Sequence, residues 1–287
     1  MLKEEYVGNK ILAVVVTYNR LECLKVCLDA IRAQTFKDFE ILVVNNGSND
    51  GTREFLDSQA DLNSIHQENL GGAGGFYSGM KYMIENEYDW IWMMDDDGIP
   101  DKDELKYLVK YSLPFSNALV IDKDDKTKLA FGSELSNAQE AKKCGIIENF
   151  IHPFNGTFIN RLVIERIGLI KKEMFIWGDE EEYILRAKKM GIIPQTVTTA
   201  IHYHPAERGM YKRVLPFFDR WKILVKPSSL SHIYYRNKGF LHFHFKERRI
   251  DLLWSLWTYP AYFIRTLQFK ELLKFIKYYF LGALNRY

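Results

Sequence analysis

The first part of the chain alternates between continuous apolar runs and amphipathic stretches. The run KILAVVVTYN at residues 10–19 is rich in β-branched residues and ends in polar side chains, which is typical of a buried parallel strand. Residues 20–36 follow with leucine and isoleucine at helical spacing, and residues 39–52 repeat the pattern of apolar run and polar loop. This alternation predicts a doubly wound α/β sheet that binds its ligand at the carboxyl ends of the strands.

The same alternation continues, less regularly, to residue 205. Residues 70–87 predict a helix that opens on a glycine-rich turn, and WIWMM at 90–94 predicts a further strand. Four later elements are predicted: a helix at 102–113, a strand at 117–122, a helix within 175–191 and an extended segment at 192–205. The polar loops TYNR, NNGSND and DDDG each follow a predicted strand. We therefore expect these loops to line a single site.

Composition is that of an ordinary globular protein. The 287 residues are 47% hydrophobic and 26% charged, which allows one large domain with an appendage. The three cysteines, Cys23, Cys27 and Cys144, form no CxxC pair, and the N-terminus lacks the apolar core of a signal peptide. The longest uncharged apolar run, residues 252–264, has 13 residues, fewer than the roughly 18 to 20 needed to cross a bilayer. We expect a cytoplasmic protein with reduced thiols.

Charge divides the chain into two regions. Residues 1–204 carry 23 Lys and Arg against 32 Asp and Glu, whereas residues 205–287 carry 16 against 5. An acidic body followed by a basic, aromatic tail indicates two functional regions. We predict a catalytic domain at residues 1–205 and a helical C-terminal region at residues 206–287.

The DDDG turn at residues 95–98 follows an apolar strand. Alternate residues of an extended segment point the same way, so Asp95 and Asp97 share one face while Asp96 points elsewhere. Adjacent carboxylates repel one another at the end of an apolar run unless a cation neutralises them. Two carboxylates on one side suit Mg²⁺ or Mn²⁺, with phosphate oxygens and water completing the shell. The alternative is an acidic turn that is simply solvated.

The glycine-rich segment NLGGAGGFYSG opens the helix predicted at residues 70–87. Gly71, Gly72, Gly74 and Gly75 would let the backbone approach a diphosphate or sugar, and a helix N-terminus favours anions. The segment matches neither the dinucleotide fingerprint nor the P-loop. A flexible loop without a ligand is the alternative.

Acidic residues and histidines supply two further candidate groups. Residues 179–182, DEEE, begin a predicted helix, where acids complement the helix dipole or, beside a sugar, act as a general base. His202 and His204 lie two apart, so either one could complete the metal shell of the Asp pair. A separate zinc site is not expected, because no third ligand is near them in the sequence.

The ordered set of motifs VVVTYNR, VVNNGSNDGT, NLGGAGGF, DDDG, NGTFINRLVIERIG and GDEEEYILR resembles the family 2 glycosyltransferases, over roughly residues 10–205. The resemblance implies a GT-A fold: a mixed, mostly parallel sheet flanked by helices, here with a helical C-terminal extension. The glycine-rich segment and the triple Asp look most like the bacterial galactofuranosyl- and rhamnosyltransferase branch. The implied enzyme is an inverting, metal-dependent hexosyltransferase.

The resemblance implies roles for individual residues. Asp95, Asp97 and His204 would hold Mn²⁺ or Mg²⁺, and we prefer His204 to His202 because it ends the extended segment, immediately before Pro205. Glu180 aligns with the family's catalytic base, and Asp179 is the alternative. The residues implied to contact the nucleotide sugar are Thr17, Tyr18, Arg20, Asn45, Asn46, Asn69, Gly71, Gly72, Gly75, Asp95, Asp96 and Trp177. For Trp177, a place in the core is equally compatible with the sequence.

The implied reaction moves a sugar to a growing, lipid-linked cell-surface glycan. UDP-galactofuranose is the favoured donor. The alternative, dTDP-rhamnose, stays open because the amide of Asn45 can pair with either uracil or thymine. A metal-dependent nucleotidyl- or phosphotransferase would use the same Asp cluster. A non-catalytic module that binds sugar or lipid is the third class. It predicts that Asp179 and Glu180 can be replaced without loss.

The C-terminal region combines tryptophan and tyrosine with lysine and arginine. This composition predicts amphipathic helices that lie in an anionic membrane interface, at the inner face of the cell membrane. The alternative is a helical cap, or a surface for self-association, whose aromatic residues pack against protein. No nucleic-acid partner is expected, since no recognised module accompanies the basic residues.

Overall fold

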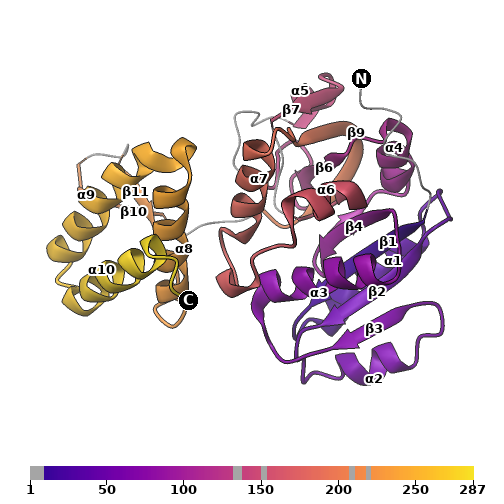
Figure 1. Ribbon diagram of the computed structural model, residues 1–287, viewed down its shortest axis with the longest axis horizontal. Helices are drawn as coiled ribbons and strands as arrows, with labels where there is room; N and C mark the ends of the chain where they lie inside the picture. The colour runs from indigo at the N-terminus through magenta and orange to yellow at the C-terminus, as the bar shows by residue number, and fades with distance from the viewer. Residues whose placement is uncertain (1–9, 132–137, 150–153, 207–210, 218–220) are drawn as a thin grey trace. The chain divides into compact units, whose positions relative to one another are not determined.

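The computed structural model describes residues 10–131, 138–149, 154–206, 211–217 and 221–287 (Figure 1). These residues divide into two compact units. The sheet unit lies within Met1–Lys172 and Tyr183–Glu207, and the helical unit lies within Glu173–Glu182 and Arg208–Tyr287. The short stretch Glu173–Glu182 therefore groups with residues that follow it much later in the chain.

In the described part of the sheet unit, nine strands form one mixed sheet. Their order is β3-β2-β1-β4-β8-β6-β9-β5, and β7 pairs with β9. The strands β3, β2, β1 and β4 are parallel, β8 is antiparallel to both β4 and β6, and β6 is parallel to β9. The bounds are β1 Ile11–Thr17, β2 Glu40–Asn45, β3 Asn63–His66, β4 Trp90–Asp95, β5 Ile99–Pro100, β6 Phe115–Asp122, β7 Ile146–Glu148, β8 Thr157–Asn160 and β9 Gln195–His204.

Helices cover both faces of this sheet (Figure 1). Their bounds are α1 Leu21–Arg32, α2 Thr52–Asp57, α3 Gly71–Glu85, α4 Glu104–Tyr111, α5 Ala138–Lys142, α6 Arg161–Ile167 and α7 Asp179–Lys189, with a 3₁₀ turn at Lys172–Met174. The first residues of α7 belong to the helical unit and the rest to the sheet unit.

The continuous apolar run of β1 is explained by burial on both faces. Val14 and Val16 pack in a cluster with α3, whereas Ala13 and Val15 pack in a second cluster with α1. The helix α3 approaches β1 so closely that a Cβ added at Gly75 would lie 2.4 Å from Val16 Cγ1. The predicted α/β class, with its mostly parallel sheet flanked by helices, is confirmed.

The parallel strands bring their polar ends to one edge of the sheet. In the register of the sheet, Thr17 pairs with Asn45, and Val16 pairs with Asp95. The predicted convergence of TYNR, NNGSND and DDDG therefore follows from parallel pairing of β1, β2 and β4.

The helical unit has a core of its own, built around α8 (Ser231–His244), α9 (Arg249–Arg265) and α10 (Phe269–Ala283), with a 3₁₀ turn at Lys246–Arg248 and a hairpin of β10 (Tyr211–Arg213) and β11 (Lys222–Leu224). Tyr259 and Phe263 are buried in this core with Tyr235, Phe275 and Tyr279. Many of the tail's aromatic residues are thus used for packing inside the unit. Among the described helices, none is long and apolar enough to cross a membrane.

Candidate active site

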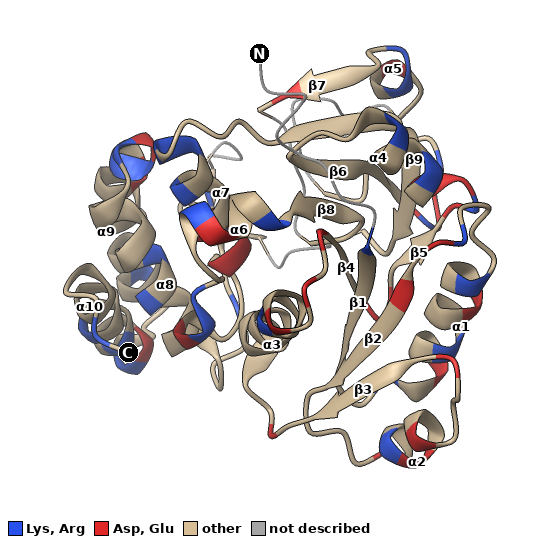
Figure 2. Cartoon of the chain, turned by 45° about the vertical axis from the view of Figure 1, so that its right-hand side comes forward, with Lys and Arg blue, Asp and Glu red and all other residues tan. Residues whose placement is uncertain are grey.

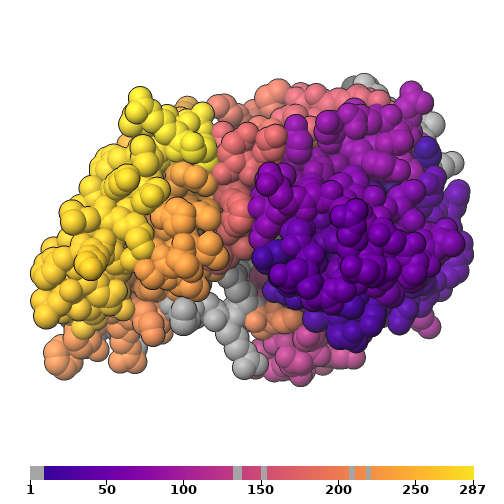
Figure 3. Space-filling model, turned by 90° about the horizontal axis from the view of Figure 1, so that it is seen from below, coloured from indigo at the N-terminus to yellow at the C-terminus, as the bar shows by residue number. Residues whose placement is uncertain are grey.

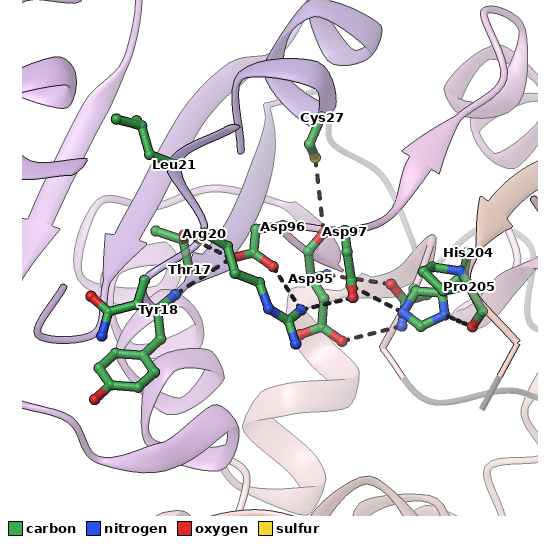
Figure 4. Close-up of polar contacts among 12 residues, drawn as sticks. Thr17, Tyr18, Arg20, Leu21, Cys27, Asp95, Asp96, Asp97, His204 and Pro205 are labelled. Atoms are coloured by element: carbon green, nitrogen blue, oxygen red, sulfur yellow. Dashed lines mark hydrogen bonds and ion pairs between the residues drawn. The ribbon is translucent and has the colours of Figure 1, made fainter. Parts of the chain in front are cut away.

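The carboxylates of the DDDG turn lie where β4 ends (Figure 4). Oxygen atoms of Asp95 and Asp97 and a ring nitrogen of His204 all lie within 4.8 Å of one another. His204 Nε2 is 3.1 Å from Asp97 Oδ1, and its Nδ1 is 2.7 Å from the carbonyl oxygen of Pro205. Two hard carboxylates and one imidazole are a donor set that fits Mn²⁺ or Mg²⁺.

Asp96 points away from this group, as the alternation along the strand predicts. Its Oδ2 accepts a hydrogen bond of 2.7 Å from Thr17 Oγ1, and its Oδ1 accepts one of 3.2 Å from Arg20 Nη1. The same Arg20 nitrogen lies 2.7 Å from Asp97 Oδ2. Arg20 is therefore a guanidinium that bridges two of the three carboxylates. Tyr18 is beside it, 45% exposed, with its backbone nitrogen 3.4 Å from Asp96 Oδ2.

Burial and neighbouring charge act in opposition on these groups. Burial raises the pKa of Asp96, and the Thr17 hydrogen bond and Arg20 charge offset this only in part. Burial also favours the neutral form of Asp97, but the hydrogen bond and charge of His204, with the charge of Arg20, hold its pKa below the ordinary value. Burial lowers the pKa of His204, yet its contact with Asp97 outweighs this and raises it. Asp97 therefore stays ionised, and its negative charge favours a cation beside it.

Asn155, to which the sequence analysis assigned no role, holds Asp95 in place. Its Nδ2 donates to Asp95 Oδ2 at 3.2 Å, and its Oδ1 accepts from the Asp95 backbone nitrogen at 3.4 Å. Asn155 is 1% exposed, and Asn117 Nδ2 donates to its carbonyl oxygen at 2.7 Å. The NGT triplet was part of the resemblance, but its position next to Asp95 depends on contacts across 60 residues.

His202 lies in a different environment from His204. It is fully buried, and its Nδ1 is 3.0 Å from Oε2 of Glu104, whose Oε1 also accepts from Trp92 Nε1 at 3.0 Å. A Cβ added at Gly98 would lie 2.3 Å from His202 Nε2, so the last residue of DDDG must be glycine for the turn to lie over this histidine. His202 therefore supports the turn from beneath.

Asn46, the first residue after β2, holds the glycine-rich loop. The Asn46 amide donates to Asn69 Oδ1 and to the Gly71 carbonyl oxygen at 3.0 Å, and its oxygen accepts from Gln67 and Leu70. All four hydrogen-bonding positions of that amide are thus occupied within the chain. Asn45 accepts from the Ser48 backbone nitrogen at 3.0 Å. The resemblance implied donor contacts for both asparagines; in the structure Asn46 positions the glycine-rich loop, whereas Asn45 positions the turn that follows β2.

The predicted glycines differ in what surrounds them. Gly71 is buried with φ +73°, and the absence of a side chain at Gly75 is required by packing of α3 on β1. Gly72, in contrast, has open space where a side chain would be. Packing therefore does not require a glycine at this position, and the contact of Gly72 with a nucleotide sugar stays a prediction.

The acidic segment and Trp177 lie in the helical unit. Asp179 is the first residue of α7 and is 2% exposed, whereas Glu180 is half-buried. The Trp177 ring is half-buried and lies 4.4 Å from the Lys226 ammonium. Trp177 is thus not fully enclosed in a core, and its contact with a sugar stays a prediction.

Comparisons with known proteins agree on one family. The profile described as "Glycosyl transferase family 2" matches residues 12–132. Galactofuranosyltransferase GlfT1 of Mycolicibacterium smegmatis is 31% identical over 248 residues, which cover 80% of this chain and 82% of the relative. Galactofuranosyltransferase GlfT1 of Mycobacterium tuberculosis is 33% identical over 227 residues, covering 72% and 74%.

Solved structures share the fold at low sequence identity. TarS residues 1–349 from S. aureus has a TM-score of 0.58 at 13% identity and covers 95% of this chain and 80% of that one. The mannosyltransferase PcManGT from Pyrobaculum calidifontis, in complex with GDP-Man and Mn²⁺, has a TM-score of 0.52 at 16% identity, covering 81% of this chain and 61% of that one. At this identity the likeness concerns the fold alone.

Proposed function

This chain belongs to glycosyl transferase family 2 and has its GT-A fold, and we propose that it transfers galactofuranose from UDP-galactofuranose to a growing, lipid-linked cell-surface glycan. The observation that carries the proposal is the similarity to two galactofuranosyltransferases over 72% to 80% of the chain. The cluster of Asp95, Asp97 and His204 supports it with the donor set that a diphosphate-bound cation requires.

The donor diphosphate is proposed to bind beside the DDDG turn. Asp95, Asp97 and His204 would hold Mn²⁺ or Mg²⁺, which when bound would neutralise charge that develops on the departing diphosphate. Arg20 is half-exposed and reaches the same carboxylates, so its guanidinium can turn to a phosphate oxygen. The hydrogen bond between Thr17 and Asp96 would orient both side chains beneath the nucleotide, and the exposed ring of Tyr18 is available to contact it.

The acceptor hydroxyl is proposed to lose its proton to Glu180 or Asp179 as it attacks the sugar from the face opposite the diphosphate. A general base contributes about 10²- to 10⁴-fold, so Glu180→Gln should lower turnover by that factor while donor affinity is retained. The matched variant is Asp179→Asn. If only the second variant is crippled, Asp179 is the base and Glu180 is not.

The donor and the reaction class are tested together. UDP and dTDP are each added with and without Mn²⁺, and the thermal stabilisation is measured; the proposal expects a Mn²⁺-dependent shift with UDP. A larger shift with dTDP would favour dTDP-rhamnose. Release of pyrophosphate in place of UDP during turnover would instead indicate a nucleotidyltransferase and overturn the proposal.

The helical unit is proposed to attach the enzyme to the inner face of the cell membrane, where lipid-linked acceptors are presented. On α10, Phe269, Leu273, Ile276 and Phe280 recur every three or four residues and are 43% to 68% exposed. Residues at the carboxyl end of the chain, yellow in Figure 3, form a continuous surface of this unit.

A second exposed stripe on α9 strengthens the case for lipid. Ile250, Leu253, Trp254 and Trp257 follow the same spacing and are 41% to 78% exposed. Lys and Arg lie on α8 and at the start of α9, blue in Figure 2. Apolar stripes and tryptophan next to basic residues match an anionic membrane interface.

A further inference from the structure

The chain immediately before α7 has an uncommon backbone conformation. Phe175 (φ 66°) and Trp177 (φ 63°) are left-handed, as is Gly178 (φ 100°). Residues with a Cβ rarely adopt this region, and where they do, the surrounding structure has to hold them there. The next two residues are the candidate bases Asp179 and Glu180.

Asn237 on α8 provides contacts that hold this turn. Its Nδ2 donates to the carbonyl oxygens of Met174 at 2.7 Å, Ile176 at 3.0 Å and Trp177 at 3.0 Å. An amide group has two hydrogens, so the three carbonyls share them. Asn237 is 1% exposed, and a buried carbonyl that loses such a donor is costly to leave unsatisfied.

Other residues of the helical unit hold the two ends of the same stretch. Arg236 Nη2 donates to the Glu173 carbonyl oxygen at 2.9 Å, and Arg248 Nε lies 2.8 Å from Glu181 Oε1. A Cβ added at Gly178 would lie 3.1 Å from a methyl carbon of Leu241. The helical unit therefore contacts the chain before the turn, at Glu173, and after it, at Glu181, in addition to the contacts of Asn237. The helix α7 begins directly after this turn.

We propose that Asn237 is a positioning residue for the transfer reaction. It sets the shape of the turn at residues 175–178, and through that turn the place of Trp177 and of the base at the start of α7. The inference rests on the proposed function, because it takes Asp179 or Glu180 as the base. It gives the helical unit a part in the chemical step, in addition to membrane attachment.

The first test compares Asn237→Ala and Asn237→Asp with the parent enzyme. A misplacement of about 1 Å costs about 10²-fold, so kcat should fall by about 10- to 100-fold, with Mn²⁺-dependent UDP affinity unchanged within about twofold. Asn237→Asp keeps the shape but turns an oxygen toward three carbonyls, so its loss should be at least as large. Amide hydrogen exchange should quicken in residues 173–182 and not in α10.

His242→Ala is the matched control. His242 is buried on the same helix, but its Nδ1 lies 2.7 Å from the hydroxyl of Tyr279, which is on α10 and not in the turn. Assayed below the melting temperature of every variant, His242→Ala should keep its kcat. A similar loss of kcat in this control would mean that any weakening of α8 lowers activity, and would overturn the specific role of Asn237.

A double-mutant cycle separates this inference from the proposed function. Asn237→Ala is combined with the base variant that has lost transfer activity, Glu180→Gln or Asp179→Asn. In that background it should change kcat by less than about threefold, because the base whose position it disturbs is already absent. A full loss in both backgrounds, or a normal kcat for Asn237→Ala alone, overturns the positioning role and leaves the proposed function intact. If neither base variant lowers transfer, the base assignment fails and the positioning role fails with it.

Discussion

Asp97 is in contact with Arg20 on one side and with His204 on the other, at 2.7 Å and 3.1 Å. Asp97→Ala removes one hard ligand and one charge, so Mn²⁺ should no longer strengthen UDP binding, and transfer should be lost. Calorimetric titration of UDP with and without Mn²⁺ measures this. Asp101→Ala, at a nearby acid outside the cluster, is the control. Equal Mn²⁺ dependence in parent and Asp97→Ala would contradict the metal assignment.

Asn155 provides a second prediction at the residue scale. Groups that orient a metal ligand typically contribute 10- to 100-fold in metal affinity, and Asn155 makes two hydrogen bonds to Asp95. Asn155→Ala should therefore raise the Mn²⁺ concentration for half-maximal activity by that factor, with kcat at saturating Mn²⁺ largely retained. Asn160→Ala, which removes the N-cap of α6, is a control of similar burial. An unchanged Mn²⁺ requirement would limit Asn155 to a structural role.

Individual residues were predictable where the pattern along the chain is local. The grouping of Asp95 and Asp97, with Asp96 turned away, follows from the alternation of a strand and needs no tertiary information. The contacts of Asn155 with Asp95 and of His202 with Glu104 join residues 60 and 98 positions apart. Periodicity along the sequence does not predict contacts over such separations, so the roles of Asn155 and His202 could be identified only from the structure.

At the scale of elements, the packing of α8 on α10 contains a buried imidazole. Burial, with the charges of Lys238 and Arg248, lowers the pKa of His242 to about 3. In the unfolded chain the imidazole of His242 takes up a proton below about pH 6.5, whereas in the folded protein it stays neutral. Stability is therefore full above about pH 6.5 and decreases as the pH falls toward 3, by about 1.4 kcal/mol per pH unit.

The acid sensitivity can be measured by thermal unfolding between pH 7 and pH 5. The parent should lose stability over this range, and His242→Gln should lose less, because it removes the group that takes up the proton. His244→Gln, at an exposed histidine on the same helix, should behave as the parent. Equal slopes in parent and His242→Gln would show that another group governs the acid response.

Long, strongly patterned elements were predicted better than short ones. The runs that form β1, β2 and β4 are apolar on both faces, and the glycine-rich start of α3 was recognised from composition. The strands β5, β7 and β8 have two to four residues, too few to show a period. Their antiparallel partners β4, β6 and β9 lie elsewhere in the chain, so pairing in the sheet makes these segments strands.

At the scale of the whole molecule, the basic tail is divided between packing and surface. Lys274 is one of the basic residues of α10, but its ammonium lies 2.9 Å from Glu271 Oε2 and donates to the Ser228 carbonyl oxygen. Arg265 similarly donates to the carbonyl oxygens of Arg213 and Val214. Lys270 and Lys277 are exposed on α10. Of the three lysines of α10, Lys270 and Lys277 are therefore the two suited to contact lipid.

Membrane attachment is tested by reversing those two charges. Each basic residue at an anionic surface contributes about 1 kcal/mol, so Lys270→Glu with Lys277→Glu should weaken binding to phosphatidylserine vesicles by about 30-fold or more, as sedimentation measures. Lys110→Glu with Lys143→Glu changes the net charge equally in the sheet unit and should have little effect. Equal binding to neutral and anionic vesicles, or a stable dimer formed through the exposed stripes, would contradict the membrane assignment.

During synthesis, the strands of the sheet leave the ribosome before Asn237, which holds the turn that precedes α7. All nine described strands of the sheet end by His204, so the part that carries the candidate metal ligands Asp95, Asp97 and His204 can fold early on the ribosome. The turn before α7 must wait until Asn237 has been added, 33 residues after His204, which takes about 2 to 7 s at ordinary elongation rates. A chain stalled in that interval would bind its donor nucleotide before it had acquired the geometry to transfer the sugar.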